Sequence, residues 1–355
     1  MEEFTQQRFD EYTQRLAELN GLSHQAVTTR KFTVDPSIQQ TLVTRMQASS
    51  DFLGRINVVP VSQLKGQKVG LTMGGSIASN TDTSTGTARK GIDPTGLDSN
   101  EYECFQNNYD TALRYAKLDM WAQFPDFQER IRNACLKRQM LDRICVGFNG
   151  TSYAKTSNRA QNPLLQDVNI GWLQHIREDA PERHMSEVEG GKKAGAITFG
   201  TAGDYDSLDS LVWDIKESLL PEWAVEDPDL VVIVGRKLVH DKYFPLINRS
   251  EGSLDMMARQ AIMADIQLGG LPVERVPYFP PTGILVTKYD NLSMYFQKGS
   301  QRREIRNQSE LDQVTDFQSS NDAYPVEDYD YVAFAENIEV RNADGSSTPE
   351  TGTGS

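Results

Sequence analysis

The chain has 355 residues, of which 38% are hydrophobic, so it can bury a substantial core without disulfides or metal ions, and its length suggests two or three domain-sized units. Its net charge of −14 argues against a phosphate backbone or an anionic membrane as the main partner, because proteins that bind those surfaces usually present a basic face. Cys104, Cys135 and Cys145 form no CxxC pair, and their odd number fits a reducing compartment. The first residues lack the basic and apolar run of a signal peptide, so we expect the protein to be made and used in a cytoplasm.

Residues 2–20 predict an amphipathic helix that ends at Asn20-Gly21. Its apolar residues recur at helical spacing, namely Phe9, Tyr12, Leu16 and Leu19. Such a helix is marginal alone in water, so it needs a partner surface. A second helical pattern covers residues 37–55, and residues 56–61 predict a strand with a proline near its end.

Residues 61–120 predict two long strands around a polar tip, with one arm at 68–73 and the return arm at 101–121. Residues 79–100 of the tip are crowded with Ser, Thr, Asn, Asp and Gly. A polar tip of this length is unusual inside a compact domain. We therefore expect it to be either disordered or held by another molecule.

Residues 126–148 predict the longest helix, because an apolar stripe runs through them and acidic residues occupy their first turn. Basic residues outnumber acidic ones along this helix, among them Arg130, Lys137, Arg138 and Arg143. The tip segment is mainly acidic and carries Asp82, Asp93 and Asp98. Two interpretations have equal weight: both are solvated faces, or the acidic arm lies across the basic helix of a neighbouring copy.

The C-terminal half begins with a short predicted helix at 171–177 and continues with a small α/β unit at 205–282. Inside that unit we expect helices at 206–220, 236–247 and 253–266 and a buried strand at 230–235. Strands at 283–287 and 292–297 flank a turn signal and predict a hairpin. Alternating apolar residues from 332 to 340 predict a final strand, and residues 343–355 have the composition of a disordered tail.

The sequence offers no motif for catalysis, a cofactor or a metal ion. His24, His175, His184 and His240 show no HxH or HxxxH spacing, so a zinc site is improbable, and surface or satisfied histidines are the default. The glycine-rich stretches at 66–70 and 74–76 fit neither a P-loop nor a dinucleotide fingerprint, and no GxSxG elbow occurs. We expect no enzyme and no cofactor. Two alternatives are a soluble enzyme with an α/β substrate domain near 205–282 and a structural ring or sheath component.

The order of these parts resembles the HK97-type capsid fold, an α+β fold with N-arm, E-loop hairpin, long spine helix, P-domain and A-domain. At residue level the chain resembles the major capsid proteins of P2-like tailed bacteriophages. The matching blocks are RLAELNG at 15–21, KFTV at 31–34, SDFL at 50–53, GSIAS at 75–79, NPLLQDV at 162–168, DPDLVVIVGR at 227–236, VPYFP at 276–280 and VEDY at 326–329. Together they cover nearly the whole chain, and the tail after Asn342 does not match.

The resemblance implies a division of the chain into functional parts. Residues 1–32 are a scaffold-docking segment that is cleaved off, 33–60 the N-arm, 61–120 the E-loop, 121–204 the P-domain with the spine helix 126–148, 205–282 the A-domain, 283–342 the closing P-domain strands and 343–355 a disordered tail. The docking helix would present Phe9, Tyr12, Leu16 and Leu19, and the maturation cut falls near Phe32-Thr33.

The resemblance also implies the function and the partners. Copies assemble as hexamers and pentamers into an icosahedral procapsid around an internal scaffold whose protease trims them. The shell expands as double-stranded DNA enters, without sequence-specific binding of that DNA and without a membrane partner. A portal protein and decoration or head-completion proteins are further expected partners. The protein belongs in the virion and is assembled in the host cytoplasm.

Overall fold

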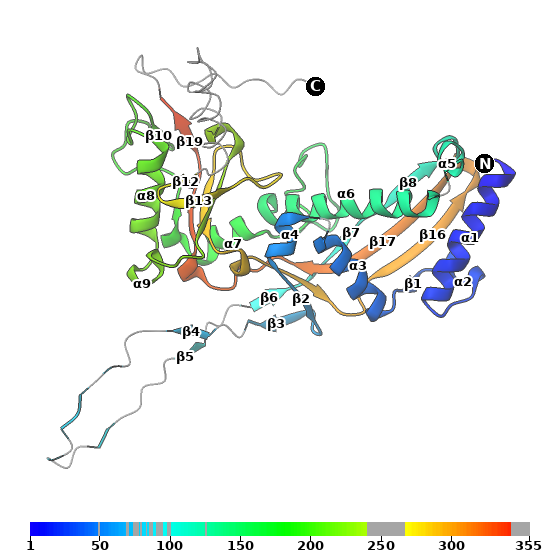
Figure 1. Ribbon diagram of the computed structural model, residues 1–355, viewed down its shortest axis with the longest axis horizontal. Helices are drawn as coiled ribbons and strands as arrows, with labels where there is room; N and C mark the ends of the chain where they lie inside the picture. The colour runs from blue at the N-terminus through cyan, green and yellow to red at the C-terminus, as the bar shows by residue number, and fades with distance from the viewer. Residues whose placement is uncertain are drawn as a thin grey trace, which may run out of the picture.

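The computed structural model describes residues 1–48, 50–68, 101–124, 126–239 and 267–341, together with 71–73, 78, 80–82, 84, 88–89 and 95–97. Two lobes lie at opposite ends of an elongated body, and a two-stranded arm leaves the body between them (Figure 1). One lobe carries α8 and a mixed sheet, and the other carries the long helix α6 above a second sheet. Among the described residues, no helix has both the length and the apolarity that a membrane crossing requires.

The sheet beneath α6 has seven strands, with the order β1-β16-β17-β15-β2, while β7 and β8 also pair with β17. Its strands are β1 (Phe32–Thr33), β2 (Asn57–Val61), β7 (Phe105–Asn108), β8 (Thr111–Arg114), β15 (Ser293–Gln297), β16 (Arg302–Gln308) and β17 (Gln313–Ala323). The eleven-residue β17 is the hub, because it pairs antiparallel with β7, β8, β15 and β16. The proline in β2 is tolerated because β2 is an edge strand.

The second lobe contains a six-stranded sheet of order β12-β13-β11-β14-β18-β9. Its strands are β9 (His184–Met185), β11 (Val231–Val234), β12 (Gln267–Leu268), β13 (Leu271–Glu274), β14 (Ile284–Thr287) and β18 (Ala333–Ala335), and a separate parallel pair joins β10 (Ile197–Phe199) to β19 (Ile338–Val340). Every residue of β11 and β14 is buried, as expected for strands in the middle of a sheet. α8 (Leu208–Leu219) begins with a Ser207–Ser210 capping box, and α9 (Glu222–Val225) follows it.

The remaining helices and short turns join these sheets. They are α1 (Glu3–Leu19), α2 (His24–Thr29), α3 (Pro36–Ala48), α4 (Asp51–Arg55), α5 (Tyr115–Ala122), α6 (Phe127–Asn149), α7 (Trp172–Asp179), η2 (Pro181–Arg183), η3 (Tyr289–Asn291), η4 (Ser309–Leu311) and η5 (Tyr329–Tyr331). The arm is built from β3 (Lys65–Gln67) paired with β6 (Glu101–Glu103) and β4 (Leu71–Met73) paired with β5 (Thr95–Leu97). The predicted helices at 2–20, 126–148, 171–177 and 206–220 and the strand at 56–61 are confirmed to within about two residues.

An aromatic core links the inner end of α6 to α7 and to the hub strand. Trp172 lies edge-on to Phe148 at 5.0 Å and to Tyr324 at 5.6 Å between ring centroids, and its indole NH donates to the Ser293 carbonyl at 2.8 Å. Gly147 of α6 faces the same indole, where an added Cβ would lie 2.2 Å from Trp172. Close approach of α6 and α7 therefore requires glycine at this position.

The predicted hairpin of 283–287 and 292–297 is wrong. β14 pairs with β11 and β18 in one sheet, whereas β15 pairs with β17 and β2 in the other. The 3₁₀ turn η3 carries the chain from one sheet to the next. All of β14 and most of β15 are buried, so each strand lies inside its own sheet and not at an exposed hairpin.

Three further element predictions are corrected by the structure. Beyond Glu103 the predicted return arm leaves the arm, since β7 and β8 join the hub strand and residues 115–122 form α5 with Leu118 and Ala122 buried one turn apart. The helical pattern at 37–55 is two helices, and Ser50 caps the second by accepting from the Leu53 NH. The final strand is split into β18 and β19 by Asn337, whose φ of 58° breaks the extended run.

The α/β unit predicted at 205–282 draws strands from outside that range. β9, β14 and β18 belong to its sheet, and the same lobe buries Ile197 and Ile338. The division of the chain into named domains stays a prediction. Residues 240–266, which hold most of two predicted helices and His240, and the predicted tail at 343–355 lie outside the described residues.

Candidate assembly surfaces

The N-terminal segment, residues 1–32, packs against the far end of the body. α1 lies on α5, and α2 lies on β16 (Figure 1). Phe9, Ala17, Val27 and Phe32 are buried in one cluster with side chains of the body. The body contributes a group that we call the seat, consisting of Leu118, Phe127, Ile305 and Val314, whose side chains are at most 6% exposed.

The seat corrects the predicted docking face of α1. Phe9 is 7% exposed and packs in the seat's cluster, and Tyr12 and Leu16 pack against it, whereas Leu19 is 53% exposed. The helix therefore finds its partner surface within its own chain, because its apolar stripe is covered by α5, α6 and β16. The outward face is mostly polar and carries the ion pairs Arg8–Glu11 at 3.4 Å and Arg15–Glu18 at 3.1 Å.

A buried polar contact orients α1 on the seat. The Arg303 Nη2 atom donates to the Tyr12 hydroxyl at 2.7 Å, and the same guanidinium pairs with Asp316 at 2.7 Å. Burial raises the pKa of the Tyr12 phenol, so that side chain stays neutral. Burial disfavours the charge on Arg303, but Asp316 and Tyr12 outweigh it and raise the pKa of the guanidinium.

The predicted cleavage residues Phe32 and Thr33 form the two-residue strand β1 at the outer edge of the seven-stranded sheet. Phe32 lies opposite Arg303 and Thr33 opposite Arg302 on β16. Phe32 is 8% exposed, and the following Val34 NH donates to the Gln301 carbonyl at 2.9 Å. A protease would therefore have to open this edge, which is short and terminal in the sheet order.

The arm leaves the body, and its described strands β4 and β5 pair with each other beyond β3 and β6 (Figure 1). Its root is fixed by Tyr102, which lies edge-on to Tyr295 with centroids 5.0 Å apart, and by Lys65, which pairs with Glu101 at 2.9 Å. At the tip, Asp82 is exposed and accepts from the Ser84 NH at 2.9 Å. Asp93 and Asp98 lie outside the described residues.

The three predicted basic residues of the spine helix lie on its exposed side. Arg130 pairs with Asp126 at 2.8 Å and lies over the Phe124 ring at 4.3 Å, and Arg138 pairs with Asp142 at 2.6 Å. Lys137 is exposed, and no ion pair to it occurs among the residues that the structure describes. Within one chain the arm points away from α6 (Figure 1), so a contact of these three residues with Asp82 stays a prediction about two copies.

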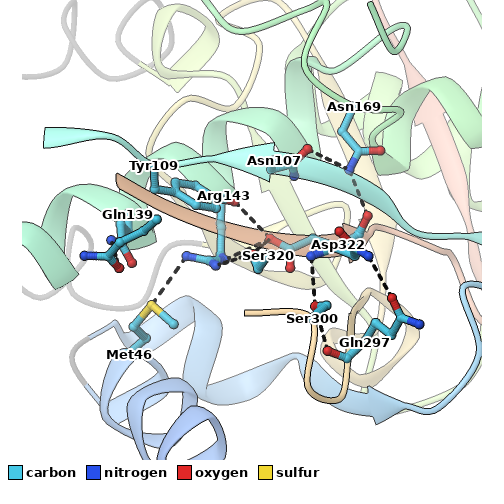
Figure 2. A network of polar contacts seen from close by, with 12 residues as sticks. Met46, Asn107, Tyr109, Gln139, Arg143, Asn169, Gln297, Ser300, Ser320 and Asp322 are labelled. Atoms are coloured by element: carbon cyan, nitrogen blue, oxygen red, sulfur yellow. Dashed lines mark hydrogen bonds and ion pairs between the residues drawn. The ribbon is translucent and has the colours of Figure 1, made fainter. Parts of the chain in front are cut away.

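A buried polar cluster that we call the junction joins the spine helix to the hub strand and to the segment of β7 and β8 (Figure 2). Arg143 of α6 is 5% exposed and Asp322 of β17 is fully buried, with 3.3 Å between Nε and Oδ2. The Arg143 Nη2 atom also donates to Ser320 Oγ at 3.1 Å, and the Tyr109 hydroxyl donates to Asp322 at 2.9 Å. The guanidinium lies 4.2 Å from the Tyr109 ring centroid, so one cation contacts a carboxylate, a hydroxyl and an aromatic face.

The junction reaches into further segments. Asn169 donates to the Asp322 carbonyl at 2.9 Å and to Asn107 at 3.4 Å, and Met46 of α3 places its sulfur 3.6 Å from the Arg143 Nη1 atom. Burial raises the pKa of Tyr109 and keeps its phenol neutral. Burial disfavours the Arg143 charge, but Tyr109 and Asp322 outweigh it and raise the pKa of the guanidinium. Sequence reasoning placed Arg143 among the surface charges, although its neighbours Met140 and Ile144 lie on the buried stripe.

The histidines and cysteines that the structure describes have ordinary structural partners or are buried. No group of residues that could hold a metal ion occurs among the described residues. His24 contacts Thr13 at 2.7 Å, and His175 and His184 contact carboxylates of Asp179 and Glu336. The described cysteines are free, and burial raises the pKa of Cys104 to about 12 and that of Cys145 to about 11, so these thiols are poor nucleophiles at neutral pH.

Comparison with known proteins gives these surfaces a context. Residues 8–338 match the family model of phage major capsid proteins of the P2 family. A capsid protein of Escherichia phage P2 is 50% identical over 343 residues, or 96% of each chain, and the major capsid protein of Serratia phage KSP20 is 42% identical over 95% of this chain and 97% of that one. The solved procapsid of satellite phage P4, which includes a size determination protein, contains a chain with 48% identity and a TM-score of 0.79 over 96% of this chain and 99% of its own. The likeness confirms the α+β, HK97-type fold.

Proposed function

The chain belongs to the P2 family of phage major capsid proteins, and from this premise we propose how its parts share the work of building an icosahedral head. As a capsid protein it is a virion component that assembles with copies of itself. We place that assembly in the host cytoplasm, around an internal scaffold and a portal protein, with decoration or head-completion proteins as later partners. The acidic chain encloses DNA without reading its sequence, and its role is structural and not enzymatic.

The projecting arm is the observation that carries this proposal. A two-stranded ribbon is marginally stable alone in water, and β4 and β5 pair with each other beyond the body. The missing support comes from a neighbouring copy, over which the arm lies. Asp82, with Asp93 and Asp98 in the same acidic segment, would face the neighbour's basic spine residues Arg130, Lys137 and Arg138. Many such contacts add up through avidity in a closed shell.

The N-terminal segment keeps its proposed role as a scaffold handle, on a different face of α1. Because Phe9 and Tyr12 are engaged with the body, docking uses the outward side, where Phe4 is 50% and Leu19 53% exposed. The scaffold's protease cuts at Phe32-Thr33 and removes the handle irreversibly. That step gives assembly a direction.

The arm proposal is tested by replacing residues 69–100 with Asn-Gly, which closes β3 onto β6 with a short hairpin loop. We expect folded capsomers and no closed shells by electron microscopy and gradient sedimentation, because the arm no longer reaches its neighbour. The finer variant is Lys137→Glu with Arg138→Glu, which should lower the shell yield.

The matched control is Lys192→Glu with Lys193→Glu, an exposed basic pair on the other lobe with the same change of charge. Normal shells from the arm replacement would overturn the role of the arm. Equal shell yields from the two charge variants would remove the arm-to-spine contact and leave the arm itself in place. Tubes or isolated rings from the wild-type chain would contradict an icosahedral head.

A further inference from the structure

The seat is an apolar surface whose present cover is a terminal segment of the same chain. Leu118 is 1% exposed, Phe127 and Ile305 are 2% exposed, and Val314 is 6% exposed while residues 1–32 are in place. They come from α5, α6, β16 and β17, and they share one cluster with Phe9, Ala17, Val27 and Phe32. Loss of the N-terminal segment would therefore uncover several large apolar side chains at one end of the molecule.

A small cavity lies between the cover and the seat. A cavity of about 30 Å³ remains between Phe9 and Tyr12 on one side and Leu118, Phe127 and Ile131 on the other, with room for about one water molecule. Polar contacts between the cover and the body include Tyr12 with Arg303 and the Glu2 NH with Asp119 at 3.0 Å. The segment is therefore held mainly by the burial of apolar side chains. This contact does not require that residues 1–32 be covalently joined to the rest of the chain.

Removing the segment would also free a sheet edge. β1 is the outermost strand in the sheet order, and its pairing with β16 consists of Phe32 with Arg303 and Thr33 with Arg302. A cut between Phe32 and Thr33 divides this strand. An apolar face beside an unpaired strand edge is a surface to which another chain can add.

The seat continues into side chains that are already exposed. Met120 lies two residues after Leu118 and Phe124 three residues before Phe127, and their side chains are 57% and 41% exposed. This end of the protein thus presents apolar surface even when it is covered. Opening the seat would enlarge that surface, and contiguous apolar patches on soluble proteins mark interaction sites.

We propose that residues 1–32 cover a contact surface for a second copy of this chain, which engages the seat and the β16 edge once the segment has left. The occupant is a second copy because a shell surrounds each subunit with identical chains at high local concentration. This inference rests on the proposed removal of residues 1–32. It adds that the cut, besides ending the contact with the scaffold, opens an interface between subunits.

The test uses the full chain with a site-specific protease sequence inserted after the exposed Arg30, in a Phe9→Asp background that releases the cut peptide. Sedimentation and native mass spectrometry follow the unassembled protein before and after cutting. We expect the cut chain to associate at a concentration at least roughly tenfold lower than the uncut wild type. A synthetic peptide with the wild-type sequence of residues 1–32, added in trans, should reverse this association.

Two matched variants keep the result interpretable. Uncut Phe9→Asp should associate as the cut chain does, whereas Gln14→Asp, at an exposed position of the same helix, should behave as wild type. If the cut chain sediments like the uncut wild type after the peptide is gone, or if the added peptide fails to reverse association, the inference is overturned. The natural cut is checked separately, because capsid chains from filled particles should begin at Thr33 by mass spectrometry whether or not the seat binds a second copy.

Discussion

The two contacts that hold the spine end and the hub strand in place differ in kind. The N-terminal segment meets the body mainly through apolar side chains, with a few polar contacts such as the Tyr12–Arg303 hydrogen bond. The junction meets the same hub strand through a buried ion pair, Arg143–Asp322, with directional bonds from Tyr109 and Ser320. The first contact comes from the end of the chain, and the second interlocks segments far apart in sequence.

The difference indicates which parts of the protein can separate. An apolar contact made by a terminal segment can detach as a unit and leave a folded body behind. Separating a buried ion pair costs much free energy, because each partner would be left as an unpaired charge away from water. The junction therefore keeps the segment of β7 and β8, the spine helix and the hub strand together. The seat, in contrast, could release the N-terminal segment and bind another chain in its place.

Removing one partner of the junction should have the largest effect. Arg143→Met leaves the buried Asp322 carboxylate without its cation, and we expect a loss of roughly 3–5 kcal/mol in the free energy of unfolding. In the double variant Arg143→Met with Asp322→Asn the loss should be clearly smaller than the sum of the two single losses. Urea unfolding followed by far-UV circular dichroism measures both quantities.

Arg138→Met is the control for this prediction, since Arg138 lies on the same helix but is 57% exposed. A cost for Arg143→Met no larger than that of Arg138→Met would show that the junction contributes no more than a surface ion pair. The junction would then not differ from the seat as a strong ionic contact, and the comparison between the two would be wrong.

Phe9→Ala should have a smaller and local effect. The truncation removes a buried ring from the seat, and we expect the opening of the N-terminal segment to become easier by about 3 kcal/mol. Hydrogen exchange of α1 and α2 should speed up by roughly two orders of magnitude, while β11 and β14 in the other lobe keep their protection. Phe4→Ala, on the exposed face, should leave exchange unchanged. Slower exchange everywhere or faster exchange in both lobes would show that the segment is not a separable unit.

The same contrast explains what the sequence could predict. The helix at 126–148 and the one at 2–20 were recoverable because their apolar residues repeat at helical spacing, which is a local signal. The surface on which the 2–20 helix packs could not be predicted, because Phe9 packs in one cluster with Ile305, which lies near the other end of the sequence. The amphipathic pattern shows that the helix needs an apolar partner surface, but it does not identify the segment or the chain that provides it. The hairpin at 283–297 failed for the same reason: the turn signal is local, while the choice of sheet is made by distant strands.

The junction escaped prediction because a charged residue is usually solvated. Arg143 lies three residues after Met140 and directly before Ile144, and both of these side chains are buried. This position beside the buried stripe is a local sign that the charge of Arg143 is compensated inside the protein. Its partner Asp322 lies 179 residues away, and no spacing rule connects the two. The resemblance to P2-like capsid proteins predicted the fold and the function. It did not predict the polar cluster, because the residues of that cluster come together only in the folded chain.

The smallest predicted effect concerns an ionic cluster whose side chains are partly buried. It extends the comparison to an ionic contact that is less buried than the junction. Glu336 accepts from Arg177 at 2.6 Å and contacts His184 at 2.9 Å, and its side chain is 21% exposed. Burial opposes its charge, but hydrogen bonds from His184 and Arg177 outweigh burial and lower the pKa of Glu336 to about 2. A carboxyl whose pKa is depressed in the folded state stabilises the protein above its unfolded pKa, and this contribution is lost as the pH falls toward the folded value.

Lowering the pH from about 6 to about 3 should therefore cost the wild type roughly 1–2 kcal/mol through this group, after a discount for its partial exposure. In Glu336→Gln that part of the pH dependence should vanish, although the variant is less stable at neutral pH. Urea unfolding at both pH values measures the difference. Glu339→Gln, which removes a more exposed carboxylate that pairs with Lys193, is the control and should keep the wild-type pH dependence. Identical pH dependence in wild type and Glu336→Gln would mean that this cluster behaves as solvated surface charge, which would leave the junction as the ionic contact whose burial affects stability.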